Sequence, residues 1–94
     1  MSVYVSKPYR KPGLAAWQYI NICDMIADTE NELMEMAERL KINVFTISIK
    51  NGVHYLIITP LQREQAANYS ARMADDEYFQ AVFKRLQDQG EAGA

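Results

Sequence analysis

The dipeptide Asn51-Gly52 lies between two apolar, β-branched runs within residues 43–59. Asn-Gly is the strongest short-range signal for a β-hairpin, because both residues tolerate the positive φ angles of a two-residue type I′ turn. The turn also fixes which residues face one another across the two strands. The predicted cross-strand pairs are Lys50 with Val53, Ile49 with His54, Ile47 with Leu56, and Phe45 with Ile58.

Alternation of side chains gives this hairpin two different faces. One face is aliphatic, ends in the single histidine of the chain, His54, and is predicted to be covered by helices; its members are Phe45, Ile47, Ile49, Leu56 and Ile58. The reverse face is mixed and is predicted to be either solvated or a docking surface; its members are Thr46, Ser48, Tyr55, Ile57 and Thr59.

A helix is predicted before the hairpin. Thr29 opens a capping box with Glu32, and Asp28 is the competing cap. The apolar residues that follow have the spacing of an amphipathic helix: Leu33, Met36, Ala37 and Leu40.

Two more helices are predicted after the hairpin. Thr59 caps the first of them, with Pro60 at its first position, and its predicted buried stripe is Ala66, Ala67, Ser70, Met73 and Ala74. Asp75 and Asp76 cap the last helix, whose apolar stripe is Phe79, Val82, Phe83 and Leu86.

The N-terminal part of the chain completes the predicted fold. Val3–Val5 and Ala16–Ile26 are predicted as strands, and Ser6–Gly13 as a loop, because prolines remove ladder donors. The order of elements predicts an α+β fold: an antiparallel-containing sheet of about four strands covered by two to three helices. Residues 1–89 are predicted to form this single domain and residues 90–94 a flexible tail.

Composition limits the classes of function. With 94 residues, 49% of them hydrophobic and 23% charged, the chain has the make-up of one ordinary globular domain. A net charge of −2 gives no global attraction to nucleic acid or to an anionic membrane. The sequence contains neither an apolar run long enough for a membrane span nor a signal peptide, and its one cysteine cannot form an internal disulfide, so a cytoplasmic protein is expected.

A further pattern extends over roughly residues 3–74. It consists of Val3-Tyr4-Val5, Met25-Ile26-Ala27-Asp28-Thr29, Glu32-Leu33, Met36-Ala37 and His54-Tyr55. These stretches resemble a small bacterial and phage family without an assigned function, whose members typically open Val-Tyr-Val-Asp, carry His-Met-Ile-Ala-Asp-Thr before the first helix, and have His-Tyr-Asp followed by Ser-Lys-Arg before the second. The resemblance implies a phage or prophage product. Such a product is expected to act in the host cytoplasm by binding a host or phage protein, for example a target in host defence or host takeover.

The chain departs from that family at its polar positions. Ser6 stands where the family has aspartate, Asp24 where it has histidine, and Leu56 where it has the aspartate of His-Tyr-Asp. Pro60-Leu61-Gln62 replaces the basic Ser-Lys-Arg. Helix caps already account for two of the retained polar residues, so the resemblance implies a shared fold more strongly than a shared chemistry.

No group of residues in the sequence predicts an enzyme. His54 and Asp24 are the candidates for a base and its orienting carboxylate, but the simpler interpretation of His54 is a structural residue hydrogen-bonded at the end of the hairpin. Cys23 is interpreted as a small buried thiol. Zinc spacing, a phosphate loop and a nucleophile elbow are all missing from the sequence, so no catalytic residue, metal or cofactor is predicted. A small hydrolase or transferase centred on His54 is the least favoured alternative.

Aromatic residues are more numerous than a core of this size needs. The chain has six tyrosines and one tryptophan, residue types that anchor protein interfaces. The predicted protein contact surface comprises Tyr4, Tyr9, Trp17, Tyr19, Ser48 and Tyr55. The chain is therefore interpreted as a small binding module for an unidentified protein partner, with homodimerisation through a sheet edge as the simplest version.

Nucleic acid is the alternative partner. Lys7, Tyr9, Arg10 and Lys11 interleave basic and aromatic side chains, as proteins do where they contact single strands. The overall charge is negative, however, and this segment supplies only three positive charges, so a solvated loop is the favoured interpretation.

Overall fold

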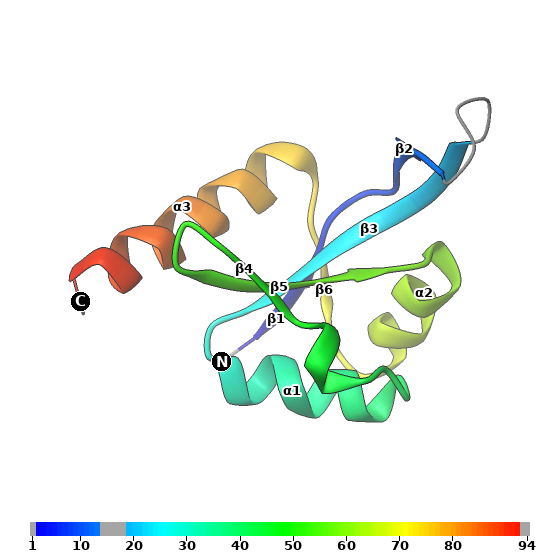
Figure 1. The fold of residues 1–94 in the computed structure, drawn as a ribbon, viewed down its shortest axis with the longest axis horizontal. Coiled ribbons are helices and arrows are strands. Elements are labelled where there is room, and N and C mark those ends of the chain that lie inside the picture. Colours follow the sequence, from blue (N-terminus) through cyan, green and yellow to red (C-terminus); the bar gives the residue numbers. More distant parts are fainter. Residues whose placement is uncertain (1, 14–18, 93–94) are drawn as a thin grey trace.

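The computed structural model describes residues 2–13 and 19–92 of the chain. Within these residues, six strands and three helices follow one another as Figure 1 shows. Their bounds are β1 Val3–Val5, β2 Tyr9–Pro12, β3 Tyr19–Ala27, α1 Glu30–Arg39, β4 Ser48–Lys50, β5 Val53–Ile58, α2 Pro60–Asn68, β6 Arg72–Met73 and α3 Asp76–Ala92, with a short 3-10 helix, η1, at Val44–Thr46.

The strands form one mixed sheet in the order β4-β5-β3-β1-β6, with β2 beside the outer half of β3. Neighbouring strands are antiparallel except β1 and β6, which are parallel. The predicted α+β class is confirmed. The sheet has six strands instead of about four, because two short strands, β2 and β6, form where the sequence predicts a loop and a helix.

Helices lie on both faces of the sheet, with α1 and α2 on one side and α3 on the other (Figure 1). The core on the α1–α2 side consists of Val3, Val5, Cys23, Met25, Ala27, Leu33, Met36, Leu40, Leu56, Ile58, Ala66 and Ala71. The core on the α3 side is smaller and consists of Tyr4, Ile26, Val53, Ala74, Phe79, Val82 and Leu86. α3 alone does not cover the whole of its face of the sheet, because Ile20 and Ile57 on that face are 50% and 43% exposed.

The Asn51-Gly52 turn has the predicted geometry, with φ angles of 53° and 81°. The two predicted pairs nearest the turn, Lys50 with Val53 and Ile49 with His54, are confirmed. The two farther pairs are not formed, because β4 is only three residues long and residues 44–46 belong to η1.

Local side-chain hydrogen bonds favour η1 over a longer strand. Asn43 Oδ1 accepts a hydrogen bond from the Phe45 N–H at 2.9 Å, and Thr46 Oγ1 donates to the Asn43 carbonyl at 2.7 Å. Short polar side chains of this kind compete with a strand ladder for backbone groups. The strand prediction was therefore wrong before Ser48.

The aliphatic face of the hairpin is covered only in part. Leu56 and Ile58 are each 1% exposed, whereas Phe45 is 91% and Ile49 64% exposed. α1 packs mainly against β1, β3 and β5, while β4 is an edge strand. The prediction that helices cover this whole face is therefore wrong at the edge.

β1 and β2 are separated by a β-bulge. Val5 is paired with Met25. Tyr9 is paired with Ile22, so the three residues 6–8 lie opposite only two residues of β3. One extra residue in one strand of an antiparallel pair is a β-bulge, and it reverses the face to which the following side chains point.

The bulge explains why two prolines do not prevent strand formation here. Pro8 lies inside the bulge and Pro12 ends an edge strand, the two places where a sheet tolerates a missing N–H. Ser6 replaces the lost ladder bonds: its N–H donates to the Asp24 carbonyl, and its Oγ accepts the Asp24 N–H, each at 2.9 Å. Arg63 Nε, from α2, donates to the Ser6 carbonyl at 3.0 Å.

The helix after the hairpin is shorter than predicted. Its cap is confirmed: Thr59 Oγ1 accepts the Gln62 N–H at 3.1 Å, and Gln62 Oε1 accepts the Thr59 N–H at 2.9 Å. α2 ends at Asn68, and Ser70, with a φ of 71°, turns the chain toward β6. Only the alanines at both ends of the predicted stripe are buried, Ala66 and Ala74, while the three residues between them are exposed: Ala67, Ser70 and Met73.

The other two helices begin where the sequence predicts. Thr29 Oγ1 accepts a hydrogen bond from the Glu32 N–H at 3.2 Å. The Glu32 carboxylate accepts a hydrogen bond from the Thr29 hydroxyl at 3.0 Å, rather than from the Thr29 backbone N–H. Asp75 accepts the N–H of Tyr78 at 2.7 Å. Their predicted apolar stripes are buried except for the partly buried Phe83. α3 continues to residue 92 and so includes the start of the predicted tail.

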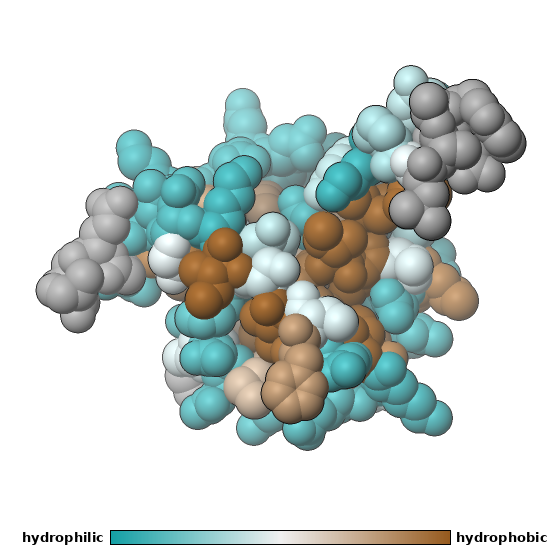
Figure 2. Space-filling view, in the orientation of Figure 1, coloured by the Kyte–Doolittle hydropathy of each residue, from teal (hydrophilic) through white to brown (hydrophobic). Residues whose placement is uncertain are grey.

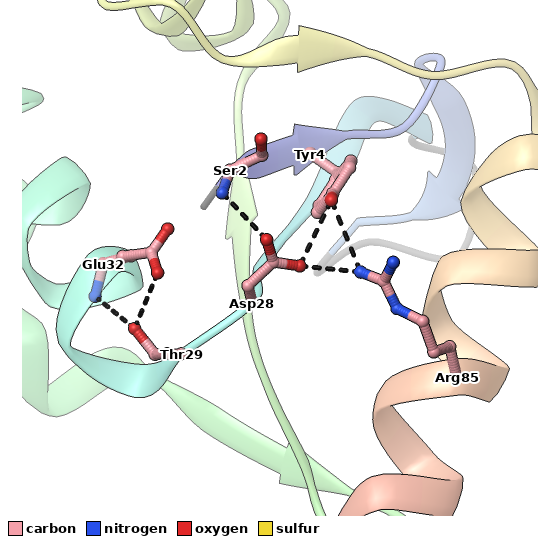
Figure 3. Close-up of polar contacts among 6 residues, drawn as sticks. All are labelled: Ser2, Tyr4, Asp28, Thr29, Glu32 and Arg85. Carbon is pink, nitrogen blue, oxygen red and sulfur yellow. Dashed lines mark hydrogen bonds and ion pairs between the residues drawn. The ribbon is translucent and has the colours of Figure 1, made fainter.

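Asp28 is not a helix cap but a junction between three parts of the fold (Figure 3). Its Oδ2 accepts the backbone N–H of Ser2 at 2.9 Å. Its Oδ1 accepts hydrogen bonds from the Tyr4 hydroxyl at 3.1 Å and from Arg85 Nη2 at 2.7 Å. One carboxylate thus joins β1 and α3 to the segment that leads into α1.

Candidate functional site

A groove of about 190 Å³ lies on the α3 side of the sheet. It is bounded by α3 on one side and by β2 and β5 on the other. Its apolar lining is Ile26, Tyr55, Ile57, Phe79 and Phe83, and its polar lining is Tyr9, Lys11, Asp24, Lys50 and Gln80. Ile26 and Phe79 are buried and form the base, while the lysines and Gln80 are exposed around it.

Strand pairing places the polar side chains on this face. Asp24 is paired with Ile57, and paired residues of antiparallel strands point to the same side of the sheet. Tyr9 is paired with Ile22, two residues from Asp24, so it shares that side, and so does Lys11. If residues 5–9 alternated regularly, with no bulge, Tyr9 would lie opposite Asn21 and point to the α1–α2 side.

Tyr9 and Asp24 form a fixed polar pair. The Tyr9 hydroxyl donates a hydrogen bond of 2.8 Å to the Asp24 carboxylate. Burial, together with the hydrogen bond and the negative charge of Asp24, raises the pKa of Tyr9 to about 12. The phenol therefore stays protonated at neutral pH and remains a donor to the carboxylate, an arrangement that suits positioning better than proton transfer.

Ionisation of Tyr9 is expected with a midpoint near pH 12, measured as the difference between near-ultraviolet titrations of the wild type and Tyr9→Phe. Asp24→Asn removes the carboxylate and is expected to move this midpoint back toward 10.0. Because the pKa is raised on folding, the pair stabilises the fold below pH 10 and this contribution is lost as the pH rises from 10 toward 12. A wild-type midpoint near 10 would show that the hydrogen bond is not formed in solution.

Positive charge gathers at the open rim of the groove. Lys11 and Lys50 are exposed there, and neither forms an ion pair with another described residue. The groove continues into a hollow beside Lys7 and Asp76. Asp24, the acidic side chain among the lining residues, is already hydrogen-bonded, so the rim lysines are available to an acidic ligand.

The structure brings together part of the predicted contact surface. Tyr9 and Tyr55 line the groove, and Ser48, paired with Tyr55, is exposed on the same side of the sheet. Tyr19 is 58% exposed but points to the opposite side, where the Arg10 guanidinium lies 5.0 Å from the centre of its ring.

Two predicted contact residues do not join this surface. Tyr4 is only 5% exposed and belongs to the α3-side core, so it is not available to a partner. Trp17 lies outside the described residues. The sequence interpretation missed Lys50 and Phe79. The hairpin register places Lys50 on the same side of the sheet as Tyr55, and this could have identified Lys50. No short-range pattern in the sequence predicts that α3 packs beside these residues.

The candidate catalytic residues lie apart. Asp24 is on the α3 side and His54 on the α1–α2 side, where its Nε2 lies 3.8 Å from the Glu30 carboxylate. Cys23 is fully buried, as predicted, and burial raises the pKa of its thiol. Among the residues that the structure describes, no group of three or more His, Cys, Asp and Glu side chains is placed to hold a metal ion.

The basic segment proposed for nucleic acid is divided between two sides of the sheet. Lys11 points to the groove, whereas Arg10, one residue earlier in β2, lies over the Tyr19 ring on the opposite side. Lys7, in the bulge, lines the neighbouring hollow. The three charges therefore do not form one continuous basic face.

No family model, curated protein or solved structure matches the chain. In the described part of the chain, no helix has the length and apolar character needed to cross a membrane. Ser6 and Asp24 are hydrogen-bonded neighbours, and Leu56 lies in the core.

Proposed function

We propose that this chain is a non-enzymatic protein-binding module that holds an extended, acidic segment of a partner protein in the groove. One observation carries the proposal: the apolar base of Ile26 and Phe79, with the half-exposed Ile57 beside it, adjoins two exposed lysines that form no ion pair with another described residue, Lys11 and Lys50. A partner segment with an apolar side chain next to a carboxylate matches both halves of this surface.

The shape of the groove favours a peptide segment over a compact cofactor. Its volume of about 190 Å³ accommodates a large apolar side chain. The hollow beside Lys7 and Asp76 continues the groove along α3, which suits a ligand that extends in one direction. A peptide segment has both properties.

The two halves of the surface contribute differently to binding. Full burial of a Leu- or Phe-sized side chain contributes about 1.5–3 kcal/mol. An exposed ion pair contributes about 0.2–1 kcal/mol, so Lys11 and Lys50 orient the ligand and accelerate association more than they strengthen it. Affinity is therefore expected to depend mainly on the apolar base.

Selection from a random-peptide display library tests the proposal. Peptides that combine Leu, Phe or Trp with neighbouring Asp or Glu are expected to be enriched. In calorimetric titrations with an enriched peptide, Ile57→Asp is expected to weaken binding by at least about tenfold, and Lys11→Glu with Lys50→Glu by a smaller factor. The matched control is Lys84→Glu, which reverses an exposed lysine of α3 that does not line the groove.

Two results would contradict the proposal. One is a selection without enrichment of acidic, apolar peptides; the other is a Lys84→Glu variant that loses as much affinity as the groove variants. Salt-dependent binding of single-stranded DNA or RNA that disappears when Lys7, Arg10 and Lys11 become alanine would support the nucleic-acid alternative. We expect no such binding, because these three side chains do not share one face.

A further inference from the structure

Within the described residues, the outer edge of β4 is a second surface without a partner. Among the described strands, β4 pairs only with β5. In Figure 1 it lies at the front, and Figure 2, in the same orientation, shows apolar side chains gathered over this region. Ile49 in β4 is 64% exposed, and Phe45 in η1, before β4 in the chain, is 91% exposed. Residues 48–50 contain neither a proline nor a bulge, two of the devices that protect edge strands from pairing, although the strand is only three residues long and includes Lys50.

The hairpin register determines which backbone groups this edge presents. A type I′ turn is closed between its first and fourth residues, Lys50 and Val53, which therefore form a hydrogen-bonded pair. Antiparallel pairs alternate, so the next pair, Ile49 and His54, is of the non-hydrogen-bonded kind. The N–H and C=O of Ile49 consequently point away from β5, toward the free edge.

We propose that the β4 edge of one molecule pairs with the same edge of a second copy, antiparallel and symmetric about Ile49. Each Ile49 N–H then donates to the carbonyl of the partner subunit's Ile49, which joins two sheets across a two-fold axis. The inference goes beyond the proposed function and does not depend on the groove.

We choose a second copy of this chain as the partner of the β4 edge because the edge is self-complementary. A single residue, Ile49, supplies both the donor and the acceptor, as a two-fold axis through that residue requires. In this register Lys50 faces the partner subunit's Ser48, so the only charges of β4 do not oppose each other. The two Ile49 side chains lie opposite one another, and the pairing covers apolar surface that is exposed in the single molecule.

Sedimentation velocity over a hundredfold concentration range reaching about 1 mM tests the pairing. The weight-average mass of the wild type is expected to rise from 10.8 kDa toward twice that value. Ile49→Lys places two like charges opposite each other at the axis and is expected to stay at 10.8 kDa throughout. Leu61→Lys is the matched control, since Leu61 on α2 is 65% exposed against 64% for Ile49, and it is expected to behave like the wild type.

Hydrogen exchange gives a second measurement that needs no variant. The Ile49 amide is expected to exchange more slowly as the wild-type concentration rises, while exposed amides of α2 keep their rates. The proposal is overturned by a wild type that stays at 10.8 kDa at every concentration, by an Ile49→Lys variant that still doubles its mass, or by an Ile49 amide whose exchange rate does not depend on concentration.

Discussion

Leu56→Ala is expected to lower the free energy of unfolding by about 3 kcal/mol. Leu56 is 1% exposed in β5 and belongs to the larger core, where truncation removes buried apolar atoms and leaves a cavity among close-packed neighbours. A domain of 94 residues has a total stability of about 5–15 kcal/mol. The loss is therefore a large share of the total, and the melting temperature is expected to fall by about 15 °C.

The neighbouring residue provides the control. Ile57 follows Leu56 in the same strand, points to the α3 side and is 43% exposed, so Ile57→Ala is expected to cost about 1 kcal/mol. Urea denaturation of the wild type and both variants measures the difference, provided that the slope with urea is unchanged. Equal losses of stability for Leu56→Ala and Ile57→Ala would contradict the structure, in which β5 is buried on the α1–α2 side and partly exposed on the α3 side.

Asp28→Ala is expected to lower the free energy of unfolding by about 2–3 kcal/mol. The carboxylate accepts hydrogen bonds from the Ser2 N–H, the Tyr4 hydroxyl and Arg85 Nη2, at 2.9, 3.1 and 2.7 Å. Tyr4 is almost fully buried, so its hydroxyl is left with only a long contact of 3.4 Å to Arg85. A buried polar group that loses its partner carries most of the cost.

Arg85→Met separates the ion pair from the rest of this junction. The Arg85 side chain is 50% exposed, so its pair with Asp28 is expected to contribute only about 0.5 kcal/mol. Thermal and urea unfolding of the two variants and of their combination form a double-mutant cycle. If Asp28→Ala and Arg85→Met have the same small effect, the hydrogen bonds to Ser2 and Tyr4 do not stabilise the fold as described.

Elements that depend on nearby residues were the ones that the sequence predicted well. The Asn51-Gly52 turn and the caps at Thr29, Thr59 and Asp75 use residues at most three positions apart, and all of them are confirmed. Their geometry depends on local φ preferences and on side-chain hydrogen bonds within one turn. Such signals are complete within a short stretch of sequence.

The errors arose where a distant or competing partner decides the structure. β2 forms because β3 offers a ladder to a proline-containing segment, and the ladder is kept in register by Ser6 and by Arg63 from α2. Asn43 ends the hairpin strand early by capping η1, a choice between two local patterns that the apolar alternation does not reveal. Asp28 was interpreted as a cap because its partners are at least 24 positions away.

The candidate site was predicted even less completely. Tyr9 and Tyr55 were identified from their residue type, yet their assembly with Lys50 and Phe79 depends on three strands and α3 meeting in space. Tyr4, of the same type, is buried instead by its position in a central strand. Residue type indicates which side chains suit an interface, and only the sheet order determines which of them share one.

The β-bulge at residues 6–8 makes the chemistry of the groove independent of the exact length of a connecting segment. With the bulge, β2 presents Tyr9 and Lys11 to the groove and Arg10 to the other side. Deleting Pro8 leaves two residues opposite the two residues of β3 between Met25 and Ile22, so regular alternation still places Tyr9 opposite Ile22 and keeps every side chain of β2 on its present side. A gain or loss of a single codon in this segment is thus absorbed at the bulge, and the ligand preference of such a scaffold stays the same.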